Sequence, residues 1–450
     1  MSLTETTVHN RTFAGPARPA TGHDDSSRLT PDRLIPDRLI PDRRNLTTAL
    51  LRPLLDRIRT GHLRIQLPDG RVMEHRGQEG AGGPVAEIHL HRWTALARIA
   101  TGGGTGAAEA YVDGDWSTPD LAACLRVAAD NLSTLQPALQ GSVWRRMGDR
   151  VLHALNANTR TGSRRNIARH YDLGNDFYRL WLDPGMTYSS ALFDETGEAG
   201  TVAESTEDGG TALLTAGQDA KFRATAALAG IQPGDRVLEI GCGWGGFAAF
   251  AARDLGATID GITLSTEQLA FGRERLRRAG LDDRARLSLT DYRDMGGTYD
   301  RIVSIEMFEA VGESRWDSWF RTVRDRLAPG GAAAVQVITI DDRAFAAYRE
   351  RPDFIQRHIF PGGMLPSPAA FRAAAARAGL RIDAERFFGP GYERTLRLWQ
   401  QRFEAAWPAI SRLPGFDERF RRLWNWYLLY CAEGFRTGRT DVGLFRLVHA

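Results

Sequence analysis

The hydrophobic pattern in the second half of the chain alternates between short apolar runs and longer amphipathic segments. The apolar runs predict strands, and they are VLEIG (237–241), TIDGITL (258–264), RLSLT (286–290), DRIVSIE (300–306) and GAAAVQVIT (331–339). Between them, FAAFAARDL (247–255), TEQLAFGRERLRRAG (266–280) and SWFRTVRDRL (318–327) have helical spacing. Strands that alternate with helices indicate a parallel sheet covered by helices on both faces, so we expect an α/β fold.

The first half of the chain shows a shorter and more mixed pattern. A helix is predicted in LLRPLLDRI (50–58), strands in HLRIQLPDG (62–70) and AEIHLHRW (86–93), and further helices in AEAYVDGDW (108–116) and PDLAACLRVAAD (119–130). The glycine-rich run ATGGGTGAAEA (100–110) favours a tight turn over a phosphate-binding loop, because no Lys-Ser/Thr pair follows it. These elements predict a small α+β domain.

Changes in composition suggest the domain boundaries. Residues 1–44 are polar and proline-rich, with the repeat RLTPDRLIPDRLIPDRR, and we interpret them as a disordered tail. The α+β domain follows at 45–143, then a basic linker at 144–165 and a larger α/β domain at 166–450. Between Trp144 and His170 there are seven arginines and one acid, which suit either a solvated linker or a segment that lies on anionic lipid head groups.

Composition excludes several classes of protein. The formal net charge of +3 gives little support for a polyanionic partner, and no nucleic acid is expected. Cys124, Cys242 and Cys431 are far apart and predict neither a disulfide framework nor a metal site. No apolar run is long enough to span a membrane, and the N-terminus lacks the apolar core of a secretory signal. We therefore expect a cytoplasmic protein, with any membrane contact peripheral.

A glycine-rich turn follows the first strand of the α/β domain. VLEIGCGWGG fits the dinucleotide pattern G-x-G-x-x-G, and Asp260 lies about 20 residues further on, so nicotinamide binding is one interpretation. Glu239 lies two residues before the first glycine, and Asp291 follows a later strand. This arrangement resembles the first motifs of Rossmann-like methyltransferases and favours S-adenosylmethionine.

Six motifs in one order make the resemblance specific. They are HYDLGNDFYRLWLDPGMTYSSALF (170–193), VLEIGCGWGGFA (237–248), GITLSTEQ (261–268), FEAVG (308–312), FPGGMLPS (360–367) and FGPGYERTL (388–396). Together they resemble the cyclopropane-fatty-acyl-phospholipid synthase and mycolic acid cyclopropane synthase family, in a longer-chain branch. The resemblance implies a Rossmann-like catalytic domain for residues 166–450 and a reaction on the double bond of an unsaturated acyl chain.

The resemblance also assigns cofactor-binding residues by position. They are Tyr188, Ser189, Glu239, Gly241, Cys242, Gly243, Gly245, Thr263, Leu264, Ser265, Gln268, Asp291, Tyr292 and Arg293. No metal ligand is implied.

Catalysis in this family needs a base, because methyl transfer to an alkene leaves a cation that must lose a proton. The resemblance implies a bound bicarbonate as the base, held by residues that match Glu309, Tyr392 and Ile338. Two positions depart from the pattern: Ser190 replaces the usual cysteine, and Gln336 replaces the usual histidine, whose charge an amide cannot supply.

A further carboxylate stands in IEMFEAVG (305–312), where Glu306 occupies a position that is usually glycine. Two hypotheses follow. Either bicarbonate still binds with help from Gln336, or Glu306 or Glu309 acts in its place as the general base. The second hypothesis also admits a product other than a cyclopropane ring: after a hydride shift, proton loss from the former methyl group would give a methylene branch, and a methyl-branched acyl chain is a further alternative.

The sequence leaves two other functions open. The substrate could instead be another alkene, such as an isoprenoid or a polyketide, or the chain could be a lipid-binding protein that has lost catalysis. The expected partners are an unsaturated phospholipid or fatty acyl chain and the inner membrane surface, with a homodimer as the expected assembly. The C-terminal aromatic residues between Phe403 and Phe435 are interpreted mainly as core, and His358 as a residue at the pocket edge.

Overall fold

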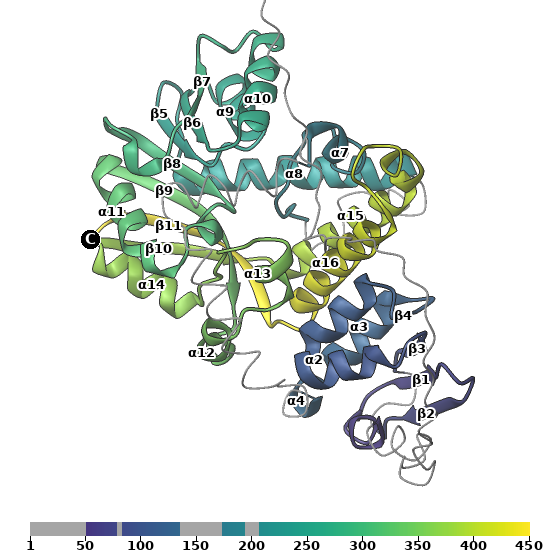
Figure 1. Ribbon diagram of the computed structural model, residues 1–450. Coiled ribbons are helices and arrows are strands. Elements are labelled where there is room, and N and C mark those ends of the chain that lie inside the picture. Colours follow the sequence, from purple (N-terminus) through teal and green to yellow (C-terminus); the bar gives the residue numbers. More distant parts are fainter. Residues whose placement is uncertain (1–50, 79–82, 136–172, 194–206) are drawn as a thin grey trace, which may run out of the picture.

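A computed structural model describes residues 51–78, 83–135, 173–193 and 207–450. The proposed tail, the basic linker and most of the acidic segment that follows Phe193 lie outside the described residues. Figure 1 shows two sheets, with the C-terminal helices lying between the larger sheet and the N-terminal elements.

The larger sheet has seven strands in the order β10-β11-β9-β8-β5-β6-β7. Their bounds are β5 (Arg236–Ile240), β6 (Thr258–Thr263), β7 (Ala285–Leu289), β8 (Tyr299–Ile305), β9 (Leu327–Ile340), β10 (Leu380–Phe387) and β11 (Thr440–His449). The five strands from β5 to β9 pair in parallel, which confirms the predicted α/β fold. β11 runs antiparallel to both β9 and β10, and neither β10 nor β11 was expected from the sequence.

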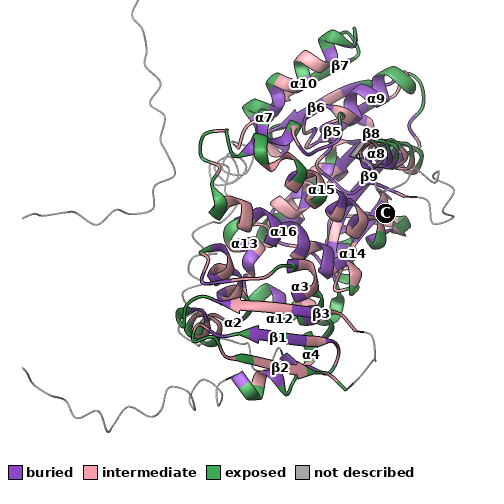
Figure 2. Ribbon diagram, turned by 90° about the vertical axis from the view of Figure 1, so that its right-hand side faces the viewer, coloured by how far each residue is buried: buried purple, intermediate pink, exposed green. Residues whose placement is uncertain are grey.

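Helices cover both faces of this sheet because its strands are apolar on both sides. Val237 packs with α8 (Glu207–Ala229), α9 (Gly246–Asp254) and α10 (Thr266–Arg278), whereas its neighbour Leu238 packs on the opposite face. The helices on that opposite face are α11 (Trp316–Arg326) and α14 (Pro368–Arg377). The buried interior of the sheet is visible in Figure 2.

The N-terminal part forms a smaller sheet in the order β2-β1-β3-β4, with bounds β1 (His62–Gln66), β2 (Val72–Arg76), β3 (Val85–Leu90) and β4 (Trp116–Ser117). Its helices are α2 (Thr94–Val112), α3 (Leu121–Asp130) and α4 (Leu132–Leu135). The tight turn expected at 100–110 is wrong in extent, because α2 continues through this run and is kinked at Gly103, with φ 56° and ψ −139°. The helix expected to reach residue 116 ends instead at Val112.

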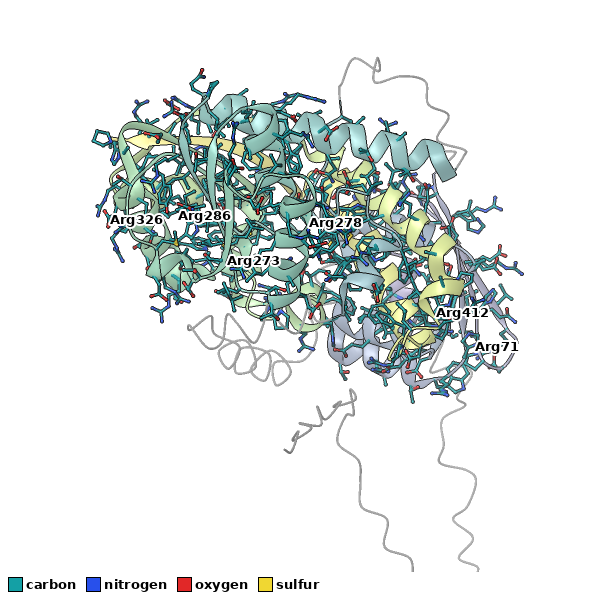
Figure 3. The ribbon with its side chains drawn as sticks, turned by 90° about the horizontal axis from the view of Figure 1, so that it is seen from above. Arg71, Arg273, Arg278, Arg286, Arg326 and Arg412 are labelled. Atoms are coloured by element: carbon teal, nitrogen blue, oxygen red, sulfur yellow. The ribbon has the colours of Figure 1, made fainter. Side chains whose placement is uncertain are left out.

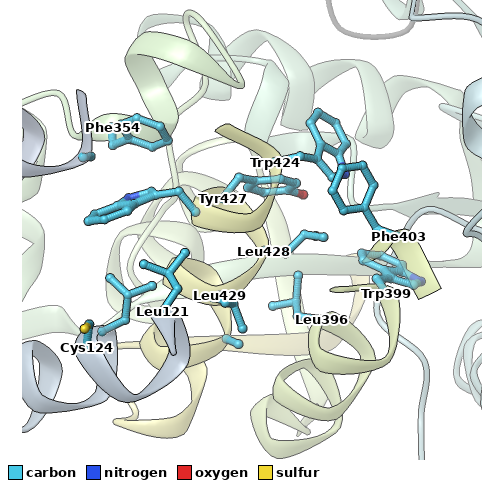
Figure 4. Close-up of a cluster of buried hydrophobic side chains, with 14 of the residues drawn as sticks. Leu121, Cys124, Phe354, Leu396, Trp399, Phe403, Trp424, Tyr427, Leu428 and Leu429 are labelled. Atoms are coloured by element: carbon cyan, nitrogen blue, oxygen red, sulfur yellow. The ribbon is translucent and has the colours of Figure 1, made fainter. Parts of the chain in front are cut away.

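Two long helices join the two parts of the molecule. α15 (Gly389–Ile410) and α16 (Glu418–Arg436) pack against each other, and α16 also contacts α2 and α3. Figure 4 shows Leu121 and Cys124 of α3 in the same cluster as Trp399, Phe403, Trp424 and Tyr427. The expectation that the C-terminal aromatic residues form core is confirmed for Phe403, Trp424, Trp426, Tyr427 and Phe435, which are all buried.

The shorter elements are α7 (Asn175–Arg179), α12 (Asp342–Glu350), α13 (Phe354–His358) and the 3-10 turns η1 (Tyr292–Asp294), η2 (Phe308–Ala310) and η3 (Glu313–Arg315).

Candidate active site

The glycine-rich turn at the carboxyl end of β5 forms one wall of a pocket. Gly241, Gly243 and Gly245 have φ of 87°, 51° and 77°, values that favour glycine. At Gly241 there is also no room for a side chain, because a Cβ would lie 2.8 Å from the Met307 side chain. Gly245 caps the start of α9. The backbone is thus shaped to approach a ligand at the edge where α/β sheets bind them.

Most of the cofactor residues assigned from the sequence line this pocket. They are Tyr188, Ser189, Glu239, Gly241, Cys242, Gly243, Thr263, Leu264, Gln268 and Tyr292. The remaining four, Gly245, Ser265, Asp291 and Arg293, are not among the lining residues, and they shape its walls instead. The Ser265 side chain caps α10 by accepting from Gln268 N–H, and Asp291 forms an ion pair of 2.6 Å with Arg293.

Glu239 is one of two glutamates that line this pocket, with Glu306. It is 3% exposed, and its Oε2 has no hydrogen-bond partner among the described residues. Burial raises the pKa of Glu239 to about 8, against the nearby charge of Lys221. A buried acceptor without a partner, beside a turn of glycines with positive φ, fits a ligand that carries a donor and lies close to the backbone.

Glu306 reaches from the end of β8 into a set of three donors. Its Oε1 accepts from the backbone N–H of Ser190 at 2.8 Å and from Nε2 of Gln336 at 2.7 Å. Its Oε2 accepts from the hydroxyl of Tyr392 at 2.5 Å. These three donors are residues for which the resemblance implied contacts to bicarbonate, so the structure brings them together around the side chain of Glu306.

The backbone of Glu306 is unusual as well. Its φ is 49°, and the only other described non-glycine residue with positive φ is Met186 at 53°. Its N–H donates to the carbonyl of Gln336 at 2.9 Å, which fixes the turn against β9. Strain of this kind persists only where surrounding contacts enforce it, and it is typical of functional positions.

Glu309 lies one turn further on, in η2, and its carboxylate has fewer hydrogen-bond donors than that of Glu306. Its Oε1 accepts from Ile338 N–H at 2.5 Å, while its buried Oε2 has no hydrogen-bond partner in the part of the chain that the structure describes. Burial and then the charge of Glu306 raise the pKa of Glu309 to about 8. Burial also raises the pKa of Glu306, but Tyr392, Ser190, Lys221 and Gln336 oppose that rise. Because Glu306 accepts three hydrogen bonds and Glu309 accepts one, the surroundings favour the negative charge on Glu306 and the proton on Glu309.

The sequence analysis missed part of the supporting structure. Lys221 of α8 donates to Ser189 Oγ at 2.7 Å, and Gln218, one turn earlier, donates to the carbonyl of Ser189 at 2.8 Å. Met307 lines the pocket and packs on Gly241. The one available signal was that Lys221 is the only lysine in the chain.

The aromatic and histidine candidates have varied surroundings. Tyr188 lines the pocket, and its hydroxyl is 2.7 Å from that of Tyr427. Phe308 is fully buried against Trp316 and Phe371, so it belongs to the core. His358 forms an ion-pair contact of 3.3 Å with Glu109 of the N-terminal part and is not among the pocket-lining residues.

Comparison with known proteins identifies the family. The profile described as "Mycolic acid cyclopropane synthetase" matches residues 158–445. The chain belongs to this family. Tuberculostearic acid methyltransferase UfaA1 of Mycobacterium tuberculosis is 39% identical over 416 residues, which cover 89% of this chain and 91% of UfaA1. Cyclopropane-fatty-acyl-phospholipid synthase of Escherichia coli is 32% identical over 371 residues, covering 82% and 88%.

A solved structure of the family supports the same conclusion. Mycolic acid cyclopropane synthase CmaA1, complexed with SAH and CTAB, matches with a TM-score of 0.56 and 31% identity, over 63% of this chain and 97% of that chain. The protein is therefore an S-adenosylmethionine-dependent methyltransferase that modifies lipid acyl chains. This excludes nicotinamide as its cofactor. In the described residues, no helix is long and apolar enough to cross a membrane.

Proposed function

We propose that this enzyme adds a one-carbon unit from S-adenosylmethionine to the double bond of an unsaturated phospholipid acyl chain, with Glu306 as the proton acceptor. The observation that carries the proposal is the carboxylate of Glu306, held by Ser190, Gln336 and Tyr392 on a residue that lines the cofactor pocket.

The cofactor, when bound, supplies an electrophilic methyl group, which an alkene carbon takes as its carbon–sulfur bond breaks. The glycine turn and Glu239 would hold the cofactor, and Glu306 lines the same pocket. The alkene electron pair forms the new carbon–carbon bond, and the substrate becomes a cation. Glu306 then accepts a proton from the former methyl group, and the electron pair left behind closes a ring or forms a double bond.

The base is Glu306 rather than bicarbonate in this proposal. Its two oxygens already take the donors of Ser190, Gln336 and Tyr392. A second anion at that place would meet the negative charge of Glu306 and would have to displace it. Gln336 suits this arrangement, because a neutral amide donor satisfies a carboxylate of the protein itself.

Glu309, in its protonated form, supports the role of Glu306 as the base. Its pKa of about 8 keeps it neutral at pH 7, so that it adds no second negative charge beside the base. Because their surroundings differ, Glu306 can carry the negative charge while Glu309 carries the proton.

The product we propose is a methylene-branched acyl chain. It forms if a hydride shift along the chain precedes proton loss, because the electron pair left by the proton then makes the carbon–carbon double bond of the branch. Support comes from the relative UfaA1, which is named a methyltransferase and matches over most of both chains. The second candidate is a cyclopropane ring, which the name of the Escherichia coli relative supports.

Lipid analysis tests both the reaction and the product. Phospholipids from a host that expresses the protein should gain one CH₂ for each modified chain, and proton NMR separates an exocyclic methylene or methyl branch from ring protons. NMR signals from ring protons would show that the product is the cyclopropane ring and not the branched chain. Unmodified lipids, from a protein that binds S-adenosylmethionine, would contradict the proposed substrate.

Replacement of Glu306 by Gln tests the base. The variant keeps the size of the side chain and loses the proton acceptor, so we expect turnover to fall by about 10²-fold or more, with little change in the affinity for S-adenosylhomocysteine. Glu313→Gln is the matched control, because that carboxylate pairs with Arg349 away from the pocket lining. Turnover of Glu306→Gln within a few-fold of the wild type would remove Glu306 from the mechanism.

A further inference from the structure

Lys221 is an unusual residue for its position. It is the only lysine in the chain, and it is fully buried on α8. Among the described residues it is the only lysine or arginine that is buried, whereas arginines such as Arg273, Arg278, Arg286 and Arg412 are exposed (Figure 3). A buried ammonium is costly unless other groups compensate its charge, so its surroundings indicate its role.

The ammonium of Lys221 holds the segment that contains the cofactor and base contacts. Its Nζ donates to Ser189 Oγ at 2.7 Å, and Ser189 lines the cofactor pocket. The next residue, Ser190, donates its backbone N–H to Glu306. Gln218, 2% exposed, holds the same segment from the same helix face through the carbonyl of Ser189. Ser189 is thus held by one charged side chain, Lys221, and one neutral side chain, Gln218.

Three carboxyl groups act electrostatically on the ammonium and raise the pKa of Lys221. In decreasing order of this effect, they are Glu306, Asp183 and Glu239. Asp183 accepts from the backbone N–H groups of Gly185 and Thr187, which leaves its charge partly satisfied by the chain. Glu239 and Glu306 both line the cofactor pocket. The charge of Lys221 therefore acts on the acid of the cofactor site and on the proposed base.

Among the described residues, the other groups that face Glu306 carry no positive charge. They are the hydroxyl of Tyr392 on α15, the amide of Gln336 on β9, the backbone N–H of Ser190 and the acid Glu309 in η2. Of the described groups that lower the pKa of Glu306, Lys221 is the only cation. Its removal would leave Glu306 with neutral donors alone.

We propose that Lys221 is a positioning residue of this reaction, which holds the Ser189–Ser190 segment and keeps Glu306 in the charged form that accepts the substrate proton. This inference rests on the proposed role of Glu306. It assigns α8 a part in setting the charge of the site, in addition to covering the sheet. The burial that lowers the pKa of Lys221 to about 8 is opposed first by Glu306, so the two charges support each other.

Two neutral replacements on α8 separate charge from position. Lys221→Met and Gln218→Met each remove one hydrogen bond to Ser189, but only the first removes a charge. Single-turnover rates are measured across pH with saturating S-adenosylmethionine and vesicles of unsaturated phospholipid. We expect the acid limb of the rate profile to move up by about one pH unit in Lys221→Met and to stay in place in Gln218→Met.

A second readout needs neither cofactor nor substrate. Infrared difference spectra, wild type minus Glu306→Gln, report whether Glu306 carries a proton, and the same difference is recorded in the Lys221→Met background. We expect Glu306 to take up its proton at higher pH in that background. Lys221→Gln is the alternative if Lys221→Met does not fold, since it can still hydrogen-bond to Ser189 without a charge, and the same shift is expected.

The outcomes separate this inference from the proposed function. If the acid limb and the infrared titration do not move in Lys221→Met or Lys221→Gln, or if they move equally in Gln218→Met, the role of Lys221 is overturned while Glu306 remains the base. If Glu306→Gln keeps its activity, the proposed base is wrong, and the inference about Lys221 fails with it.

Discussion

Glu306 occupies a backbone position that a glutamate rarely takes. Its φ of 49° is strained for any residue with a Cβ, and glycine would adopt it more easily. The strain places a carboxylate among donors from three separate parts of the chain: Ser190, Gln336 and Tyr392. We interpret this strained backbone as the feature that lets a side chain of the protein, Glu306, act as the base.

The sequence predicted these residues but not their arrangement. Glu306, Gln336 and Ser190 were singled out as departures from the family pattern. Their contacts could not be predicted, because the hydrogen bonds join residues 30 to 116 positions apart. Lys221 has no motif around it, and its role depends on burial, which appears only in the folded chain.

Glu309 predicts a pH dependence of stability. Its pKa in the folded chain is about 8, above its ordinary value of 4.5. The contribution of such a group is full below the lower value and is lost as pH rises towards the higher one, because the unfolded chain ionises first. We expect the melting temperature of Glu309→Gln, relative to the wild type, to rise between about pH 5 and pH 8.

Calorimetry across that pH range checks this expectation, with Glu313→Gln as a control for loss of a more exposed carboxylate. A constant difference between wild type and Glu309→Gln would show that Glu309 is already ionised in the folded protein. The division of charge and proton between Glu306 and Glu309 would then be wrong.

At the scale of elements, alanine variants of two glycines near β5 should separate a loss of cofactor affinity from a loss of stability. Gly241 and Gly234 have φ of 87° and 88°, but only at Gly241 would a Cβ meet another side chain, that of Met307. We expect each alanine variant to lose about 1 kcal/mol of stability through backbone strain. Only Gly241→Ala should also lose affinity for S-adenosylhomocysteine, by about tenfold or more, because its new methyl group disturbs the pocket.

Thermal unfolding and titration calorimetry measure the two effects separately. Equal affinities for Gly234→Ala and Gly241→Ala would mean that the turn does not hold the cofactor.

The parallel strands β5 to β9 were predicted from the sequence, and the antiparallel edge was not. β5 to β9 are apolar runs separated by helices, a pattern specific to buried parallel strands. β10 is buried only at Leu380 and otherwise alternates between exposed and partly buried positions, and β11 follows long amphipathic helices, so the partner of each depends on the folded sheet. The kinked helix α2 was missed because its glycines favour a turn when considered alone.

At the scale of the whole molecule, the N-terminal part shares a core with the catalytic domain. Leu121, Leu125 and Trp116 belong to the same hydrophobic cluster as Trp399 and Tyr427. Ion pairs reinforce this contact, including Arg436 with Asp130 and Arg419 with Asp113. The predicted boundary at residue 143 remains a prediction, and the continuous core indicates that the two parts unfold together.

Replacement of Arg436 tests this coupling. Arg436 also contacts the buried Glu433 at 2.5 Å, so Arg436→Met removes an ion pair with Asp130 and one of the two ion pairs of Glu433, which keeps its contact with Arg397. We expect a single unfolding transition in both proteins, with the melting temperature of the variant lowered by several degrees and its affinity for S-adenosylhomocysteine unchanged. Two separate transitions in the wild type would show that the N-terminal part folds independently.

The dependence of turnover on bicarbonate tests the role of Glu306 most directly. Glu306→Gly removes the carboxylate, relieves the positive φ and leaves the donors of Ser190, Gln336 and Tyr392 free for a small anion. In buffers purged of carbon dioxide, we expect the wild type to keep its full rate and Glu306→Gly to be inactive until bicarbonate is added. A wild-type enzyme that loses its activity without bicarbonate and regains it on addition would contradict a base built into the chain.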